Sequence, residues 1–226
     1  MPAVPDPRAY PLAVEEAVAF EVNGTIVATL MCTPRDLEVL ALGYLFTRGA
    51  IASRDDVAGI RTDAHGVRVR LRRSNVTSLT DPRPRSTVLP RRDPLPLASI
   101  QSWVRQMFDR ADMRREIGGG MHSAGLADRD GLRCVYEDVG RHNAVDKAIG
   151  RGLADQVDFS RCCLVSSGRI AADMAAKAIA AGVPIFASRS IPTTAAYEMA
   201  VRSGLAMIGR VASEAPIVYT GGERLG

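Results

Sequence analysis

The chain has 226 residues, of which 46% are hydrophobic, so it is long enough to bury a substantial core as one domain or as a main domain with a smaller attachment. The formal net charge is +4, and arginine, whose planar guanidinium group suits phosphates, supplies nearly all of the positive charge. The first residues lack the apolar stretch of a secretion signal, and no uninterrupted apolar run reaches about 18 residues. We therefore expect a cytoplasmic protein with neither a membrane nor a nucleic-acid partner.

The N-terminal part predicts a β-hairpin followed by one amphipathic helix. Apolar residues alternate with polar or small ones in residues 18–22 and again in residues 26–30, and Asn23-Gly24 between them supplies a turn that tolerates positive φ. Thr33-Pro34 then predicts the N-cap and the first position of a helix that ends before Gly49.

Residues 66–72 predict a strand with two different faces. One face carries Val67, Val69 and Leu71, and the other carries Arg68, Arg70 and Arg72. The basic face is either a solvated outer surface or a surface that faces an anion. The proline-rich, polar residues 75–96 predict a long loop, and a helix capped by Ser99 follows it.

The second half of the chain predicts an α/β fold. Residues 121–126 and 132–136 indicate another hairpin, and Asp138 is placed to cap a helix that runs to about Leu153. Strands are then expected at 162–165, 184–187 and 205–208, and helices at 170–181 and 194–202. This regular alternation predicts a parallel βαβαβ unit, with a final edge strand at 217–220.

Two connections in this unit are candidates for an anion site. Ser166-Ser167-Gly168-Arg169 follows the first strand, and the segment that begins with Ser188-Arg189 follows the second. Ligands bind such sheets beyond the carboxyl ends of the strands, where free backbone N–H groups meet. The alternative is that the hydroxyl groups only cap helices and that the arginines face solvent.

Two histidines accompany acidic and basic residues near these loops. We expect the hairpin and the next helix to bring together His122, Glu137, Asp138, Arg141 and His142. Imidazole beside carboxylate is an arrangement for proton transfer. In the alternative, structural interpretation, Asp138 caps the helix, Glu137 pairs with Arg141, and His142 packs partly buried. No metal site is expected, because the zinc deaminase pattern is missing.

The four cysteines are expected to be reduced. Cys134, Cys162 and Cys163 lie in predicted strands, where core packing is the expected role. Cys32 precedes the first predicted helix and is the most exposed candidate for a reactive thiol, although core packing is favoured there too.

An eleven-residue block from Glu137 to Lys147, Glu-Asp-Val-Gly-Arg-His-Asn-Ala-Val-Asp-Lys, carries a family resemblance. Together with Gly119-Gly-Met-His122, Ser167-Gly-Arg169 and Thr33-Pro34, it closely resembles the FdhD proteins, the sulfur carriers required for formate dehydrogenase activity. The similarity extends from the first hairpin to Tyr219-Thr220.

The resemblance implies a cytidine-deaminase-like three-layer fold without the zinc, a homodimer, and binding of the bis(molybdopterin guanine dinucleotide) molybdenum cofactor. The implied partners are formate dehydrogenase and a cysteine desulfurase, whose persulfide sulfur the family passes to the molybdenum centre. The family's cofactor-contact segment corresponds to Arg210, Val211, Ala212, Ser213, Glu214 and Ala215. With it we group Ser167, Gly168, Arg169, Ser188, Arg189, His122, Arg141 and His142 as expected cofactor-binding residues.

The chain departs from the family at three places. Family members usually carry Cys-Gly-x-Cys-Gly in the loop that corresponds to residues 77–97, and this loop contains no cysteine. Gly118 replaces a threonine, and Ala212-Ser213 replaces an Arg-Gly pair. A persulfide needs a sulfur atom, so the usual relay cannot run through this loop.

Three functions are therefore compared. The first is an FdhD-type accessory protein that binds the cofactor and supports its sulfuration, with the persulfide route lost or relocated; the second is a non-catalytic cofactor-binding chaperone. The third is an enzyme that acts on a nucleotide-like ligand through His122 and His142. Residues 1–98 are expected to form the smaller N-terminal part and residues 99–226 the α/β cofactor-binding domain, unless the two are continuous.

Overall fold

The computed structural model describes residues 11–63, 66–72, 88–90 and 93–226. It contains two sheets, whose strand orders are β2-β1-β4-β3 and β10-β9-β8-β7-β5-β6. In the larger sheet the strands are β5 (His122–Asp128), β6 (Gly131–Asp138), β7 (Cys163–Ser166), β8 (Ile185–Ser188), β9 (Ala206–Gly209) and β10 (Ile217–Thr220). β7, β8 and β9 are parallel, whereas β5, β6 and β10 join them by antiparallel pairing.

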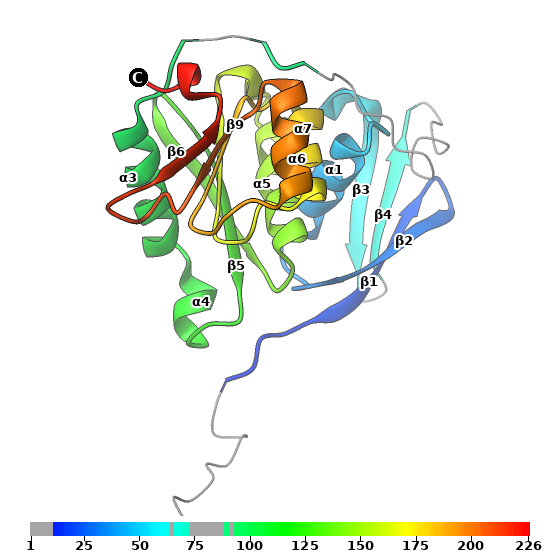
Figure 1. Ribbon diagram of the computed structural model, residues 1–226. Coiled ribbons are helices and arrows are strands. Elements are labelled where there is room, and N and C mark those ends of the chain that lie inside the picture. The colour runs from blue at the N-terminus through cyan, green and yellow to red at the C-terminus, as the bar shows by residue number, and fades with distance from the viewer. Residues whose placement is uncertain (1–10, 64–65, 73–87, 91–92) are drawn as a thin grey trace, which may run out of the picture.

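Helices cover both faces of the six-stranded sheet (Figure 1). α3 (Leu97–Asp109) packs on one face, where Ile100 and Val104 join a buried cluster with Val165 and Ile208. The other face carries α5 (Arg141–Ala154), α6 (Ala172–Ala181) and α7 (Thr194–Ser203). This arrangement is the three-layer α/β fold, and the predicted parallel βαβαβ unit is confirmed as β7-α6-β8-α7-β9.

The second sheet lies beyond the helical layer (Figure 1). It consists of β1 (Glu16–Val22), β2 (Thr25–Cys32), β3 (Val57–Asp63) and β4 (Gly66–Leu71). α1 (Leu37–Thr47) connects it to the rest of the molecule by packing against α5. A Cβ at Gly43 would lie 1.8 Å from the Asp146 carbonyl oxygen, and a Cβ at Gly150 would lie 1.9 Å from that of Val39, so the two glycines permit the close approach of the helices.

Most of the predicted elements are present, and the boundaries differ for physical reasons. Both hairpins are confirmed, and the basic strand is β4, with its valines buried and its arginines exposed. The predicted start of α1 at Thr33-Pro34 is wrong, because the N-cap is Asp36, and Ser99 is not the cap of α3, which begins after Pro96. β3 and the short helix α4 (Asp112–Glu116) were not predicted.

Three 3₁₀ helices complete the described elements, at Arg54–Asp56, Phe159–Arg161 and Gly222–Arg224. None of the helices in the described ranges is long and apolar enough to cross a bilayer. The proposed boundary near residue 98 stays a prediction. Most of the loop at residues 77–97 lies outside the described residues.

Candidate functional site

The carboxyl ends of β7 and β8 meet at one edge of the larger sheet, as expected for parallel strands. Ser166 pairs with Ser188 in the strand register, and the backbone N–H of Arg189 donates to the Ser166 carbonyl oxygen at 3.1 Å. The Ser188 hydroxyl donates to the carbonyl oxygen of Gly168 at 2.5 Å. The two predicted anion loops are therefore adjacent and braced against each other. We call this part of the molecule the carboxyl edge.

The serine hydroxyl groups at this edge are used within the protein. Ser166 Oγ accepts from the Gly168 N–H at 3.2 Å, Ser188 Oγ accepts from the Ser190 N–H at 3.1 Å, and Ser167 Oγ accepts from the Ser123 N–H at 2.9 Å. These bonds support the interpretation that the hydroxyl groups shape the loops. The side chains of Arg169 and Arg189 are exposed, so the basic groups remain available to a ligand.

His122 lies at the start of β5, beside the first loop. Its Nδ1 atom is 3.4 Å from the Ser167 hydroxyl oxygen. Burial lowers the pKa of His122 below its ordinary value, and the positive charges of Arg141 and Arg114 lower it further. The imidazole is therefore neutral at pH 7 and can exchange hydrogen bonds with a ligand.

Arg141, the first residue of α5, packs closely against Gly168. A Cβ at Gly168 would lie 3.1 Å from both Cβ and Cδ of Arg141 and 3.4 Å from His122 Nδ1. The Nε atom of Arg141 is buried and has no hydrogen-bond partner among the described residues. A buried donor without a partner is costly, and an anionic ligand would satisfy it. The residues at this edge thus fit the diphosphate arms of the cofactor that the sequence implies.

His142 occupies the next position and faces α6. Its Nε2 atom is 2.6 Å from the Asp173 carboxylate oxygen. Burial lowers the pKa of His142 by more than the Asp173 charge raises it. Thus the two histidines lie at the same edge, and His142 has a carboxylate within ion-pair distance.

Glu137 does not take part in the predicted acid/base group. Its carboxylate accepts hydrogen bonds from the backbone N–H groups of Met113 at 2.8 Å and Arg114 at 2.9 Å. It therefore caps the first turn of α4, where a negative charge is favourable. Both expectations for Glu137, a catalytic carboxylate and a partner of Arg141, are wrong.

Asp138 forms a fully buried ion pair with Lys147 at 2.7 Å. It also accepts from the backbone N–H groups of Thr33 at 3.2 Å and Gly140 at 2.9 Å. The predicted N-cap role is wrong, since Gly140 is the N-cap of α5. The pair instead ties the end of β2 to the start of α5 and so fixes the helix turn from which Arg141 and His142 project.

The C-terminal segment also reaches the carboxyl edge, because it follows β9. The Arg210 N–H donates to the Ser190 carbonyl oxygen at 2.9 Å, and the Ser213 hydroxyl donates to the Arg210 carbonyl oxygen at 2.7 Å. Val211 is buried in the core, whereas the other members of the predicted set are exposed: Arg210, Ala212, Ser213, Glu214 and Ala215. Their binding role stays a prediction.

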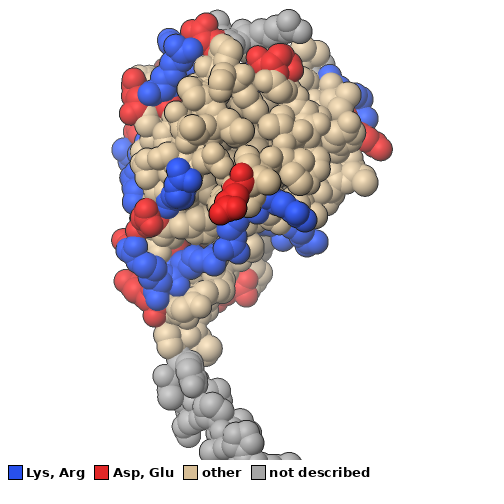
Figure 2. Space-filling view, turned by 60° about the vertical axis from the view of Figure 1, so that its left-hand side comes forward, with Lys and Arg blue, Asp and Glu red and all other residues tan. Residues whose placement is uncertain are grey.

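Arg114 was missed by the sequence analysis. It lies on α4, a five-residue helix with no recognisable apolar period, and its Nη1 donates to the Met121 carbonyl oxygen at 3.3 Å. In the described part of the chain none of the basic side chains Arg114, Arg141, Arg169, Arg189 and Arg210 lies within ion-pair distance of a carboxylate. Figure 2 shows a band of basic side chains across the lower part of one side of the molecule.

All four cysteines are free, and none is a thiolate at neutral pH. Burial raises the pKa of Cys32 and Cys134 to about 11 and that of Cys162 to about 12, and it raises the pKa of Cys163 as well. Cys32 is fully buried, so its expected exposure is wrong. Cys134 is the partly exposed thiol. No group of three His, Cys, Asp or Glu side chains suited to a metal ion occurs among the described residues.

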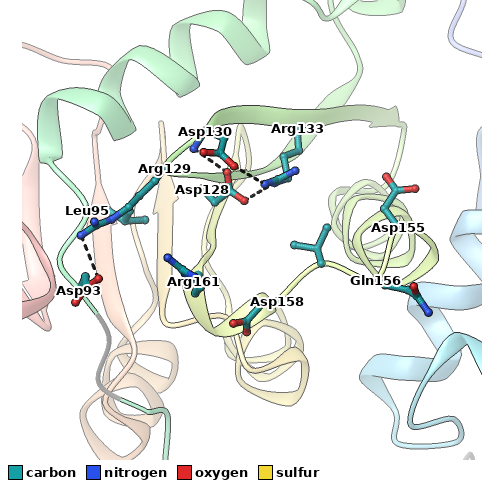
Figure 3. Close-up of a pocket in the computed structure, with 11 residues that line it drawn as sticks. Asp93, Leu95, Asp128, Arg129, Asp130, Arg133, Asp155, Gln156, Asp158 and Arg161 are labelled. Atoms are coloured by element: carbon teal, nitrogen blue, oxygen red, sulfur yellow. Dashed lines mark hydrogen bonds and ion pairs between the residues drawn. The ribbon is translucent and has the colours of Figure 1, made fainter.

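A separate cavity of about 850 Å³ opens at the opposite, amino edge of the parallel strands. It lies between the β5–β6 turn and the connection that follows α5 (Figure 3). Arg133 forms ion pairs with Asp128 and, at 3.0 Å, with Asp130, and Arg129 is 3.6 Å from Asp93. Several charges of this amino-edge cavity are thus neutralised within the protein.

The FdhD/NarQ family model matches residues 13–93 and 80–226. The chain is 35% identical over 255 aligned residues to the sulfur carrier protein FdhD of Anaeromyxobacter dehalogenans, with 95% of this chain and 88% of that protein covered. It is 33% identical to the sulfur carrier protein FdhD of Methanothermobacter thermautotrophicus, with 92% and 88% covered.

A solved structure is also similar. The crystal structure of a putative formate dehydrogenase accessory protein from Desulfotalea psychrophila superposes with a TM-score of 0.81 at 28% sequence identity. The superposition covers 94% of this chain and 90% of that one. The likeness therefore extends over most of both chains.

Proposed function

Because the chain belongs to the FdhD/NarQ family, we propose that it is a formate dehydrogenase accessory protein that binds the bis(molybdopterin guanine dinucleotide) molybdenum cofactor at the carboxyl edge. The relatives are named sulfur carrier proteins, and the solved neighbour is described as a putative formate dehydrogenase accessory protein. A homodimer and a cytoplasmic site of action belong to the same proposal and rest on the family resemblance.

The observation that carries the proposal is the unneutralised positive charge of the carboxyl edge. Each guanine dinucleotide arm contains a diphosphate, and guanidinium groups bind phosphates through paired hydrogen bonds. Arg141 offers a buried donor that has no partner in the described part of the protein, and His122 beside it is neutral and can exchange hydrogen bonds. When bound, the cofactor would supply the molybdenum centre, whereas this chain would supply charge, hydrogen bonds and a fixed orientation.

The burial of the thiols limits the sulfur chemistry of this chain. A persulfide carrier needs an accessible thiolate, and the raised pKa values keep the cysteines protonated. We therefore assign to this chain the holding of the cofactor and its transfer to formate dehydrogenase. Any sulfur that reaches the molybdenum would come directly from the persulfide of the cysteine desulfurase partner.

A labelling experiment tests this assignment. The purified chain is incubated with a cysteine desulfurase and cysteine that contains radioactive sulfur, and protein-bound label is read after electrophoresis without reducing agent. We expect label on the desulfurase and none on this chain. A family member that has the Cys-Gly-x-Cys-Gly loop is the positive control for transfer.

In a second candidate function, the chain carries sulfur as a persulfide on Cys134, the one of the four cysteines that is only partly buried. In that case the label would appear on this chain and would be lost in Cys134→Ser but retained in Cys32→Ser. The same pair of variants therefore decides between a cofactor chaperone and a sulfur carrier.

A further inference from the structure

An aromatic ring at the carboxyl edge contacts two of the basic side chains. Phe108 is the penultimate residue of α3, Arg114 lies on α4, and Arg189 follows β8. The guanidinium carbon of Arg114 is 5.4 Å from the centroid of the Phe108 ring, and that of Arg189 is also 5.4 Å from it. Both distances lie within the range of a cation–π interaction, which extends to about 6 Å.

The shared ring brings two like charges together. Since each guanidinium carbon is 5.4 Å from the same point, the two lie no further apart than twice that distance. Like charges at such a separation repel each other, and within the described ranges no carboxylate forms an ion pair with either group. An anion that binds between them would remove this repulsion.

Arg114 is held in place from two sides. The Glu137 carboxylate accepts from its backbone N–H at 2.9 Å, and the Arg114 guanidinium donates to the carbonyl oxygen of Met121, the residue before His122. Met121 immediately precedes His122, so this hydrogen bond places the Arg114 side chain beside the start of β5. Arg114 thus belongs to the same site as His122 and Arg141.

Arg189 is held by the loop that carries it. Its N–H donates to the Ser166 carbonyl oxygen, and the preceding Ser188 donates through its hydroxyl group to the carbonyl oxygen of Gly168. The base of the Arg189 side chain is therefore fixed relative to the loop that contains Gly168. The guanidinium group at the other end of the Arg189 side chain contacts the Phe108 ring, and the same ring contacts Arg114.

We propose that Phe108 is a positioning residue that holds Arg114 and Arg189 as a clamp for a diphosphate group. The inference rests on the proposed function, because it assigns to this clamp the diphosphate of one guanine dinucleotide arm. Two phosphate groups joined by one oxygen can accept hydrogen bonds from both guanidinium groups at once. A single phosphate group spans a shorter distance than a diphosphate, so it bridges two guanidinium groups that are held apart less well. The clamp therefore selects diphosphates over monophosphates.

Calorimetric titration with inorganic pyrophosphate and inorganic phosphate, at one pH and one ionic strength, tests the clamp. In Arg114→Gln and in Arg189→Gln we expect the affinity for pyrophosphate to fall about tenfold each, the effect of losing one hydrogen bond between charged groups. The affinity for phosphate should change less, so the preference for pyrophosphate should shrink. Arg105→Gln, an exposed arginine on the same helix α3, is the matched control and should bind both anions as the wild type does.

Phe108 is tested by two replacements. Phe108→Leu keeps an apolar side chain but removes the ring, and we expect weaker binding of pyrophosphate with only a modest fall in the unfolding temperature, because Phe108 is partly buried against the core. Phe108→Tyr keeps the ring and should restore the affinity. If Phe108 acts through the arginines, Phe108→Leu should have no further effect in a chain that already carries Arg114→Gln and Arg189→Gln. An equal loss in both backgrounds would overturn the positioning role.

Failure of the clamp and failure of the proposed function give different results. If wild-type protein binds GDP and both arginine variants bind GDP and pyrophosphate equally well, the clamp is wrong and the proposed function stands. If wild-type protein binds neither GDP nor pyrophosphate, the proposed cofactor site is wrong and the clamp fails with it.

Discussion

The two edges of the six-stranded sheet differ in whether their arginines are paired with carboxylates. At the amino edge, the cavity lined by the β5–β6 turn pairs Arg133 with two aspartates, and aspartates outnumber arginines in its lining (Figure 3). At the carboxyl edge, the described arginines have no carboxylate partners, and the Nε atom of Arg141 is buried without a hydrogen bond.

This difference is the reason why we propose the carboxyl edge, and not the larger cavity, as the binding site. The amino-edge cavity is large, but its ion pairs and its excess of aspartates leave little attraction for an anionic ligand. The carboxyl edge keeps several positive charges close together, which is unfavourable until an anion arrives. Uncompensated positive charge, rather than cavity volume, is thus the feature on which we base the proposed ligand site.

The largest expected effect comes from breaking the buried ion pair between Asp138 and Lys147, which fixes the start of α5 at the carboxyl edge. Lys147→Met leaves the Asp138 carboxylate buried without its cation, and we expect the free energy of unfolding to fall by about 3–5 kcal/mol. Urea unfolding followed by circular dichroism measures this. Asp155→Asn, which removes the exposed partner of Arg151, is the control and should cost less than about 1 kcal/mol.

Removing the negative charge of Asp138 as well should recover part of the stability that Lys147→Met loses. In a chain with both Lys147→Met and Asp138→Asn, we expect a smaller loss than with Lys147→Met alone, because no buried charge is left unpaired. Equal losses in the single and double variants would show that the pair matters only for packing.

A methyl group at the carboxyl edge should weaken ligand binding by about tenfold. The Cβ of Gly168→Ala would press on Arg141, which must shift away from the loop, and would touch His122. Calorimetry with GDP measures the change. Gly59→Ala is the control, since its Cβ would have no neighbour within 4 Å. Unchanged GDP affinity in Gly168→Ala would show that Arg141 is not part of the ligand site.

Acidification should destabilise the protein through the same edge. The folded protein lowers the pKa of His122 from 6.5, so the unfolded chain takes up a proton more readily and the free energy of unfolding falls as the pH drops below 6.5. His122→Gln should lose less stability than the wild type between pH 7.5 and about pH 5. Parallel stability curves for the two proteins would contradict a depressed His122 pKa.

The smallest effect is expected at the amino edge. Arg133→Gln breaks two partly exposed ion pairs, so it should lower stability by less than about 1 kcal/mol and leave GDP affinity unchanged. A clear loss of GDP affinity in this variant would move the ligand to the amino-edge cavity and reverse the comparison of the two edges.

Local patterns were sufficient to predict the βαβαβ unit. The glycines that end α6 and α7 adopt the left-handed conformation that glycine tolerates, Gly182 with φ 79° and Gly204 with φ 70°. The anion loops followed from the same alternation, because the topology of parallel strands fixes which connections are neighbours.

Local sequence patterns did not predict the contacts between residues that are far apart in the chain. Asp138 was predicted to cap a helix because it precedes α5 in the sequence. Its actual partners are the backbone N–H of Thr33, 105 residues away, and the buried ammonium group of Lys147, and no local pattern indicates either contact. α4 escaped prediction because it is stabilised by Glu137 from outside the helix rather than by its own sequence. Cys32 was expected to be exposed beside a helix start, but it is the last residue of β2 and faces the core.

Hydrogen–deuterium exchange with and without saturating GDP tests the central claim most directly, because it reads both edges in one experiment. We predict that GDP slows exchange of the backbone amides in residues 122–123, 141–143, 167–169 and 189–190, and leaves residues 128–133 and 156–161 unchanged. Protection confined to the second group, or no protection at a GDP concentration that saturates binding, would contradict a ligand site at the carboxyl edge.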